Sequence, residues 1–165
     1  VVLRQPNRAD GAQVWQLVTR MGVLEPNTCY AYVLLCTHFA GTSAVAEVDG
    51  RLLGFVMAYR PPVRPEAVFV WQVGVHPDAR GLGLARRMLT HVAYAPGCAG
   101  ITHLEATVAA SNVPSTRLFA GFARHLGVPC ERQAGFAPAD FHPLEHEAEP
   151  LLRIGPLPDA PPLTA

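Results

Sequence analysis

Residues 80–85, RGLGLA, combine an arginine with two glycines at the start of a stretch that has helical periodicity. Apolar residues then recur on one helix face, at positions 82, 85, 88 and 89. A helix start usually carries Ser, Thr or Asp, whose side chain caps the free backbone N–H groups. An uncapped start attracts anions through those N–H groups and the helix dipole, and glycine lets an anion approach closely. The segment therefore predicts a phosphate-binding turn, with a tight turn that binds no ligand as the alternative.

A buried strand and a helix must position this turn. Residues 67–75, AVFVWQVGV, are apolar on both faces, which predicts a central strand covered on both sides. Two β-rich runs joined at Asp49–Gly50 predict a hairpin within residues 43–59. The other expected strands are 1–6, 102–108, 128–133 and 151–157. The other expected helices are one capped by Asp10, 113–127, and 30–39, for which a strand is the alternative; a long loop is expected over 134–149. This order predicts an α/β (α+β) fold, a mixed central sheet with helices on both faces.

Composition excludes several classes of protein. The chain has 165 residues and a formal net charge of zero, which favours one compact domain and argues against a general nucleic-acid binder. No apolar run approaches the roughly 18 residues that span a membrane, and residues 1–10 lack the apolar core of a signal peptide. The four cysteines form no CxxC pair, so we expect reduced thiols, no metal site and a cytoplasmic location.

Three phosphate-binding families have glycine-rich turns of this kind. The P-loop pattern GxxxxGK[ST] is absent from the chain. The dinucleotide-binding pattern GxGxxG fails because its third glycine position is Arg86, although Glu105 has roughly the spacing of its acidic residue. Arg80, Gly83 and Ala85 fit the third pattern, [QR]xxGx[GA], which belongs to the Gcn5-related N-acetyltransferases (GNAT), a family that this chain resembles.

Residues 106–123 extend this resemblance, since they match the GNAT segment N-x-x-[SA]-x-x-[LF]-[YF]-x-x-x-G-F with its final spacing one residue short. The resemblance implies a GNAT domain over residues 1–156, followed by a Pro/Ala-rich tail over 157–165. It implies that the central strand parts from the next one, and that the pantetheine of acetyl-CoA pairs with the exposed edge like an added strand. The acetyl-CoA-binding residues that it implies are Val73, Val75, Arg80, Gly81, Leu82, Gly83, Leu84, Ala85, Asn112, Ser115 and Phe119.

Three stretches, residues 24–47, 69–89 and 146–156, resemble a narrower family, the L-2,4-diaminobutyrate acetyltransferases of bacterial ectoine synthesis. The resemblance implies transfer of an acetyl group from acetyl-CoA to the γ-amino group of L-2,4-diaminobutyrate, by a cytoplasmic homodimer. Glu25 departs from it, because aspartate is expected at that place.

A substrate with two amines and one carboxylate needs acids for its second ammonium and fixed distances between its charged groups. The candidate substrate-binding residues are Glu25, Asn27, Tyr32, Trp71, Glu105 and Glu149. Each carboxylate has an alternative role as a solvent-facing group or a helix cap. Glu105 lies in an otherwise apolar strand, where burial is costly without a partner.

The attacking amine must lose a proton, and His146, three residues before Glu149, is the preferred acceptor or relay because histidine titrates near neutrality. A surface histidine is the alternative. The place where many GNAT relatives carry a proton-donating tyrosine is Phe119 here, so either Tyr30 or Tyr32 replaces it or the thiolate leaves without a proton from the enzyme. The Val75 N–H is the expected oxyanion donor, by resemblance to the bulged central strand of the family.

Alternation places Trp71 on the same strand face as the cofactor-binding valines, where it could wall the acceptor pocket, with core packing as the alternative. Two other functions stay open at this point. One is acetylation of another small amine or a peptide N-terminus, and the other is an acyl-CoA-binding regulatory domain, which the missing tyrosine favours.

Overall fold

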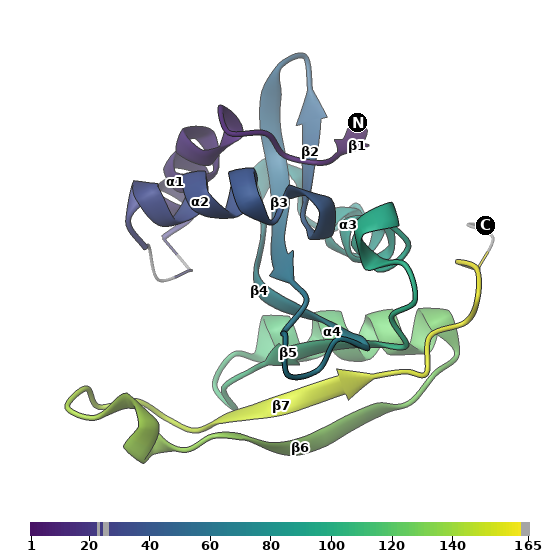
Figure 1. Cartoon of the computed structure of the whole chain (residues 1–165). Helices are drawn as coiled ribbons and strands as arrows, with labels where there is room; N and C mark the ends of the chain where they lie inside the picture. The colour runs from purple at the N-terminus through teal and green to yellow at the C-terminus, as the bar shows by residue number, and fades with distance from the viewer. Residues whose placement is uncertain (23, 25–26, 163–165) are drawn as a thin grey trace.

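One mixed β-sheet organises the chain, with the strand order β1-β2-β3-β4-β5-β7-β6 (Figure 1). The computed structural model describes residues 1–22, 24 and 27–162. Neighbouring strands are antiparallel except β4 and β5, which are parallel. The strands are β1 (Val2–Arg4), β2 (Ala44–Val48), β3 (Arg51–Tyr59), β4 (Ala67–Val75), β5 (His103–Thr107), β6 (Cys130–Phe136) and β7 (Glu149–Ile154). The predicted mixed sheet and the hairpin at Asp49–Gly50 are confirmed.

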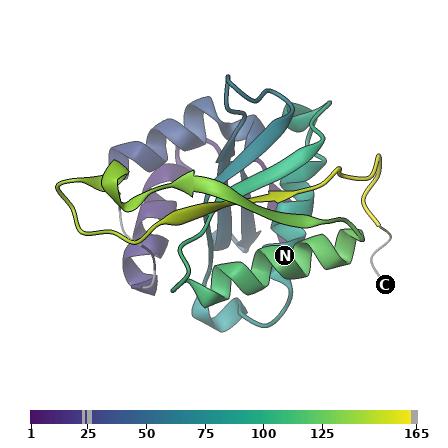
Figure 2. The ribbon, with the colours of Figure 1, turned by 90° about the horizontal axis from the view of Figure 1, so that it is seen from below.

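Helices cover both faces of this sheet, as predicted (Figure 2). They are α1 (Asp10–Met21), α2 (Cys29–His38), α3 (Leu84–Ala93) and α4 (Val113–Leu126). The larger core cluster joins α3 and α4 to the inward positions of β4, β5 and β7, whereas α1 and α2 pack on the other face of β2 and β3. Among the helices, α2 has apolar residues all round, but only Tyr32 and Cys36 are fully buried.

The predicted capping role of Asp10 is wrong, because Asp10 lies in the first turn of α1 and its carboxylate turns away from the helix. It accepts hydrogen bonds from both terminal nitrogens of Arg4, at 2.7 and 2.9 Å, and from the Asn7 N–H at 2.7 Å. Burial favours the neutral carboxyl, but these bonds outweigh it and lower the pKa of Asp10. An ion pair with β1 therefore takes the place of the expected cap.

The loop predicted over residues 134–149 is shorter in the structure. β6 continues to Phe136, a short 3₁₀ helix covers Pro138–Phe141, and β7 begins at Glu149, two residues before its predicted start. Antiparallel pairing with β7 extends β6 to Phe136 through Ala134 and Gly135, which are individually weak strand formers. The start of the predicted tail is anchored, since the Leu157 N–H donates to Thr102 O at 2.8 Å. Residues 163–165 of that tail lie outside the described residues.

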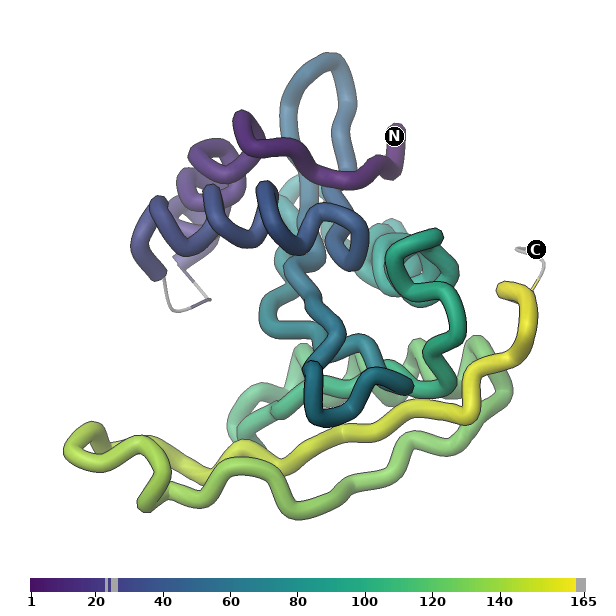
Figure 3. The backbone as a smooth tube through the Cα atoms, viewed as in Figure 1, coloured from purple at the N-terminus to yellow at the C-terminus, as the bar shows by residue number. Residues whose placement is uncertain are grey.

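The parallel strands β4 and β5 part after a short ladder. Ala67–Phe69 pair with His103–Glu105, and the rest of β4 has no β5 partner in the described ladder. Figure 3 shows the consequence in the chain path, with α1, α2 and the β2–β3 hairpin above and with α4, β6 and β7 below. The opening between these strands, which the resemblance to the GNAT family implied, is confirmed, and it exposes the edge of β4.

Candidate functional site: a cleft between two parted strands

The glycine turn presents the uncapped helix start that the sequence predicted. Gly81 and Gly83 have positive φ angles of 76° and 69°, a left-handed conformation that glycine adopts without strain. Gly83 is the N-cap residue of α3, and no side chain caps this helix. The first N–H groups of α3 therefore remain available to an anion, and the dipole of α3 favours negative charge there.

The edge of β4 that faces the opening carries, at alternate residues, backbone groups that have no strand partner among the described strands. The His76 N–H donates to Leu53 O at 2.7 Å, so the backbone of Val75 points the other way, toward the opening. The Arg80 Nε–H donates to the carbonyl oxygen of Val75 at 3.3 Å, which agrees with that direction. Val73, two residues earlier, points its N–H and carbonyl to the same side. An extended ligand could pair with this edge as an added strand.

A β-bulge in β4 changes which side chains share a face. Val70 pairs with Ala58 and Gln72 pairs with Met57, which leaves Trp71 as the extra residue. Val73 and Val75 therefore pack on the α3 and α4 side, whereas Trp71 packs with the α1 and α2 cluster. The prediction that Trp71 shares a face with these valines is wrong, because simple alternation does not anticipate an extra residue.

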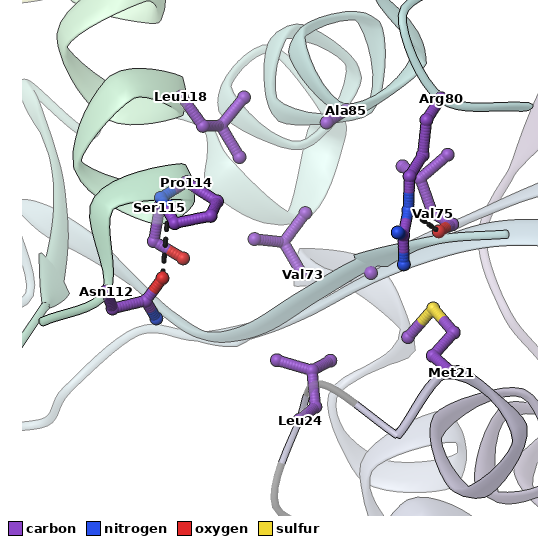
Figure 4. Close-up of a pocket in the computed structure, with 11 residues that line it drawn as sticks. Met21, Leu24, Val73, Val75, Arg80, Ala85, Asn112, Pro114, Ser115 and Leu118 are labelled. Atoms are coloured by element: carbon purple, nitrogen blue, oxygen red, sulfur yellow. Dashed lines mark hydrogen bonds between the residues drawn. The ribbon is translucent and has the colours of Figure 1, made fainter. Parts of the chain in front are cut away.

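A cavity of about 460 Å³ lies between the β4 edge and α4, and we call it the edge cavity (Figure 4). Asn112, Ser115 and Leu118 form its α4 wall. Asn112 caps α4, because its Oδ1 accepts the Ser115 N–H at 3.1 Å. Met21 and Leu24 close the side next to α1. The cavity thus connects the phosphate turn at one end with the start of α4 at the other.

The structure brings six of the predicted cofactor-binding residues together around the edge cavity. They are Val73, Val75, Arg80, Ala85, Asn112 and Ser115. Leu84 and Phe119 belong to the core instead, so their side chains are not available to a ligand in the cavity. Leu82 points away from the protein, with 73% of its surface exposed. Gly81 and Gly83 contribute backbone alone.

A second hollow, of about 540 Å³, shares Asn112 and Pro114 with the edge cavity and contains three glutamates, so we call it the acidic pocket. His146 and Glu149 both line it, with Nε2 and Oε1 3.6 Å apart. The His146 ring stacks on Phe141, with ring centroids 4.0 Å apart, and its Nδ1 lies 2.7 Å from the carbonyl oxygen of Glu147. The predicted amine-handling pair therefore lies next to the predicted cofactor site.

Contacts from β5 and from the turn before α4 hold the carboxylates of the acidic pocket. The Thr107 hydroxyl donates to Glu149 Oε2 at 2.8 Å. The Ser111 hydroxyl and N–H both donate to the Glu147 carboxylate. Neither contact is visible in the sequence, because both join residues that are 36 or more positions apart.

Tyr32 takes the interior position of α2 and Tyr30 the outward one, because residues two apart on a helix point in different directions. Tyr32 is fully buried, donates its hydroxyl to Gln72 Oε1 at 2.9 Å and packs against Trp71. The Asn27 N–H donates to the Tyr32 hydroxyl at 3.4 Å. Tyr30 is 69% exposed and lines neither hollow.

Glu105 is held in a different arrangement. It is fully buried, and its two carboxylate oxygens accept from Arg64 at 2.9 Å and from Arg153. Arg153 also pairs with Glu66. The two arginines thus neutralise the buried Glu105 carboxylate at the end of the sheet where β4 and β5 pair. Glu105 lines neither hollow. Glu25 lies outside the described residues.

Sequence reasoning missed Met21, Leu24 and Leu118, which line the edge cavity, and Gln72, which binds Tyr32. The apolar residues carried no signal that separates a cavity wall from the core. Gln72 did stand out as the one polar side chain in an apolar strand, and that signal could have found it.

Among the described residues, no group of three or more His, Cys, Asp or Glu side chains is arranged to hold a metal ion. The four cysteines are unpaired. In the described part of the chain, no helix is long and apolar enough to cross a bilayer.

Comparison with known proteins agrees with this geometry. Residues 12–122 match the family model of the acetyltransferase (GNAT) family. The L-2,4-diaminobutyric acid acetyltransferase of Bordetella parapertussis is 47% identical over 160 residues, which are 96% of this chain and 86% of that protein. The protein of the same name from Halalkalibacterium halodurans is 40% identical, over 95% of this chain and 82% of its own length. The structure of diaminobutyrate acetyltransferase EctA from Paenibacillus lautus, in complex with L-2,4-diaminobutyric acid and coenzyme A, is 40% identical, covers 94% of each chain and superposes with a TM-score of 0.87.

Proposed function

Because the chain belongs to the GNAT acetyltransferase family and, within it, to the diaminobutyrate acetyltransferases, we propose that it transfers an acetyl group from acetyl-CoA to the γ-amino group of L-2,4-diaminobutyrate. The product is N4-acetyl-L-2,4-diaminobutyrate, and we place the reaction in ectoine biosynthesis and the response to osmotic stress. The observation that carries the proposal is the edge cavity that opens beside the acidic pocket.

The residues around the edge cavity fit acetyl-CoA, which supplies the acetyl thioester. The first N–H groups of α3 and the left-handed glycines suit a diphosphate, because they offer donors without a side chain in the way. The exposed backbone of Val73 and Val75 suits the amide groups of pantetheine. The Val75 N–H would also donate to the carbonyl oxygen of the acetyl group as that oxygen gains negative charge.

The acidic pocket fits an ammonium group for a reason of hydrogen-bond chemistry. The Glu147 carbonyl oxygen accepts only, so the Nδ1 of His146 next to it must carry the ring proton. In the neutral imidazole, Nε2 then presents a lone pair toward Glu149 Oε1, which is also an acceptor. With the imidazole in this neutral form, the two atoms are acceptors 3.6 Å apart, and an amine with its protons can donate to both. We assign Nε2 of His146 as the proton acceptor and Glu149 as the carboxylate that holds an ammonium.

Protonation of the leaving thiolate by a tyrosine finds no support in the described contacts. Phe119 has no proton to donate, and Tyr30 points outward. Tyr32 donates its only hydroxyl proton to Gln72 and packs beside Trp71, and neither ring lines the edge cavity or the acidic pocket. Of the alternatives that the sequence left open, we therefore favour departure of the thiolate without a proton from a tyrosine.

A steady-state assay with acetyl-CoA and a panel of amines tests the proposed function. We expect turnover of diaminobutyrate to exceed that of ornithine and lysine, with NMR of the product showing acetylation at the γ nitrogen. Equal turnover of all diamines or of peptide N-termini would instead support a broad acetyltransferase, and binding of acetyl-CoA without turnover would support a regulatory domain. Either result would refute the proposal.

Variants of the acidic pocket test the residue roles. Glu149→Gln should raise the KM for diaminobutyrate, and His146→Gln should lower kcat, because the two side chains bind and deprotonate the acceptor respectively. Asp159→Asn, which removes a negative charge from an exposed position that lines neither hollow, is the matched control and should change neither constant. If the control lowers activity as much as the pocket variants do, the losses in the pocket variants come from the change in overall charge, and the assigned residue roles are wrong.

We also propose that the chain works as a homodimer in the cytoplasm. β6 is an edge strand of the sheet, and all seven of its residues are exposed. Phe136 in β6 and Leu144 in the following loop present large apolar surfaces. A second copy would cover this edge. Sedimentation equilibrium should give twice the chain mass for the wild type and the mass of one chain for Phe136→Glu. A monomeric wild-type protein would refute the proposed homodimer. The four unpaired cysteines are consistent with a reducing compartment.

A further inference from the structure

Thr107 is the last residue of β5, and its side chain contacts a carboxylate that lines the acidic pocket. Its hydroxyl donates to Glu149 Oε2 at 2.8 Å, whereas Oε1 of the same carboxylate faces His146. Glu149 lines the acidic pocket, but Thr107 does not. The hydroxyl therefore occupies one oxygen of the carboxylate and leaves the other one directed into the pocket.

The sheet register fixes this contact. Thr107 pairs with Leu151 as the last residue of the β5–β7 ladder, so Glu149 is its diagonal neighbour on the same face of the sheet. The next backbone bond, from the Val108 N–H to Pro150 O at 3.0 Å, holds the two strands together beside it. Glu149 is also fixed from its other side by pairing with Phe136 of β6. Both partners of the hydrogen bond are thus attached to a rigid element, which is what a precisely placed carboxylate requires.

We propose that Thr107 is a positioning residue that orients the Glu149 carboxylate for the ammonium group of the acceptor. The inference rests on the proposed function, since it concerns how that acceptor is held. Without the hydroxyl, the carboxylate can rotate about its side-chain bonds, and its oxygens no longer hold one direction relative to His146 Nε2. Binding of the diamine weakens, while the edge cavity and the glycine turn, which lie on β4, α3 and α4, are unaffected.

The test compares Thr107→Val, which keeps the shape and removes the hydroxyl, with Thr107→Ser, which keeps the hydroxyl. A hydrogen bond to a charged group corresponds to about a tenfold to hundredfold change in an equilibrium constant. We expect T107V to raise the KM for diaminobutyrate by about that factor, with the KM for acetyl-CoA unchanged, and T107S to restore most of the loss. Calorimetry of diaminobutyrate binding should show the same order of affinities without any turnover.

Glu149→Ala and the double variant T107V/E149A separate the possible failures. If Thr107 acts through Glu149, T107V adds little to the effect of E149A, and the two changes are strongly non-additive. Additive effects, or a T107V enzyme with an unchanged KM for diaminobutyrate, would overturn the inference. If E149A itself leaves diaminobutyrate binding intact, the acceptor site proposed above fails instead. Thr107→Ala replaces T107V if thermal unfolding shows that the valine variant does not fold.

Discussion

Replacement of Gly83 by valine separates the ligand-binding role of the glycine turn from its role in folding. Gly83 has a φ of 69°, and a Cβ there would meet only the far end of the Arg86 side chain, at 3.8 Å. Space is therefore available, and the cost to folding is the left-handed backbone conformation, about 1–2 kcal/mol for a residue with a side chain. For a chain of this size, that cost lowers the melting temperature by about 2–8 °C.

Gly127 provides a matched control, because its φ is also 69° and a Cβ there would meet nothing within 4 Å. It ends α4, at the opposite end of that helix from Asn112. Gly127→Val should therefore lower the melting temperature by a similar amount. The two variants differ in one respect: a side chain at position 83 stands over the free N–H groups of α3, and one at position 127 does not.

Calorimetric titration with acetyl-CoA then distinguishes the two. Loss of one charge-assisted hydrogen bond to the diphosphate is worth about 1.5–3 kcal/mol, so G83V should raise the Kd by about tenfold to a hundredfold. G127V should keep the affinity of the wild-type protein. The reasoning about the uncapped helix start is refuted if folded G83V binds acetyl-CoA as tightly as the wild type, or if G127V loses affinity equally.

Three further predictions concern the interior. Glu105→Gln leaves two arginines facing a neutral amide at a buried position, and urea unfolding should show that the free energy of unfolding falls by about 3–5 kcal/mol. A fall of less than about 1 kcal/mol would contradict the importance of this ion network. Gly97→Ala should destabilise the fold because its Cβ would overlap the carbonyl oxygen of Gly41, whereas Gly41→Ala meets its nearest neighbour at 3.7 Å and should be tolerated in a thermal melt. Because the pKa of Asp10 is lower in the folded than in the unfolded protein, its ionised carboxylate stabilises the fold above the unfolded pKa, near 4, and this stabilisation is lost as the pH falls through the folded pKa. The free energy of unfolding should therefore decline below about pH 4 less steeply in Asp10→Asn than in the wild type.

The parts of the site that are local in the chain could be predicted from its residues alone. The glycines at 81 and 83 and the uncapped start of α3 follow from a few consecutive residues, as does the buried strand that precedes them. The pairing of His146 with Glu149 also came from spacing, since the two are three residues apart. Local features of this kind are legible because backbone conformation and capping depend on immediate neighbours.

Which distant residues meet depends on how the whole chain packs. The bulge at Trp71 turned that side chain to the other face of the sheet, and it depends on how β4 pairs with β3. Glu105, a candidate acceptor-binding residue from the sequence, pairs with Arg64 and Arg153, which come from distant parts of the chain. The bond from Thr107 to Glu149 exists because β5 and β7 pair in one register. Strand order and register are set by the packing of the whole sheet, and no short stretch of sequence contains that information.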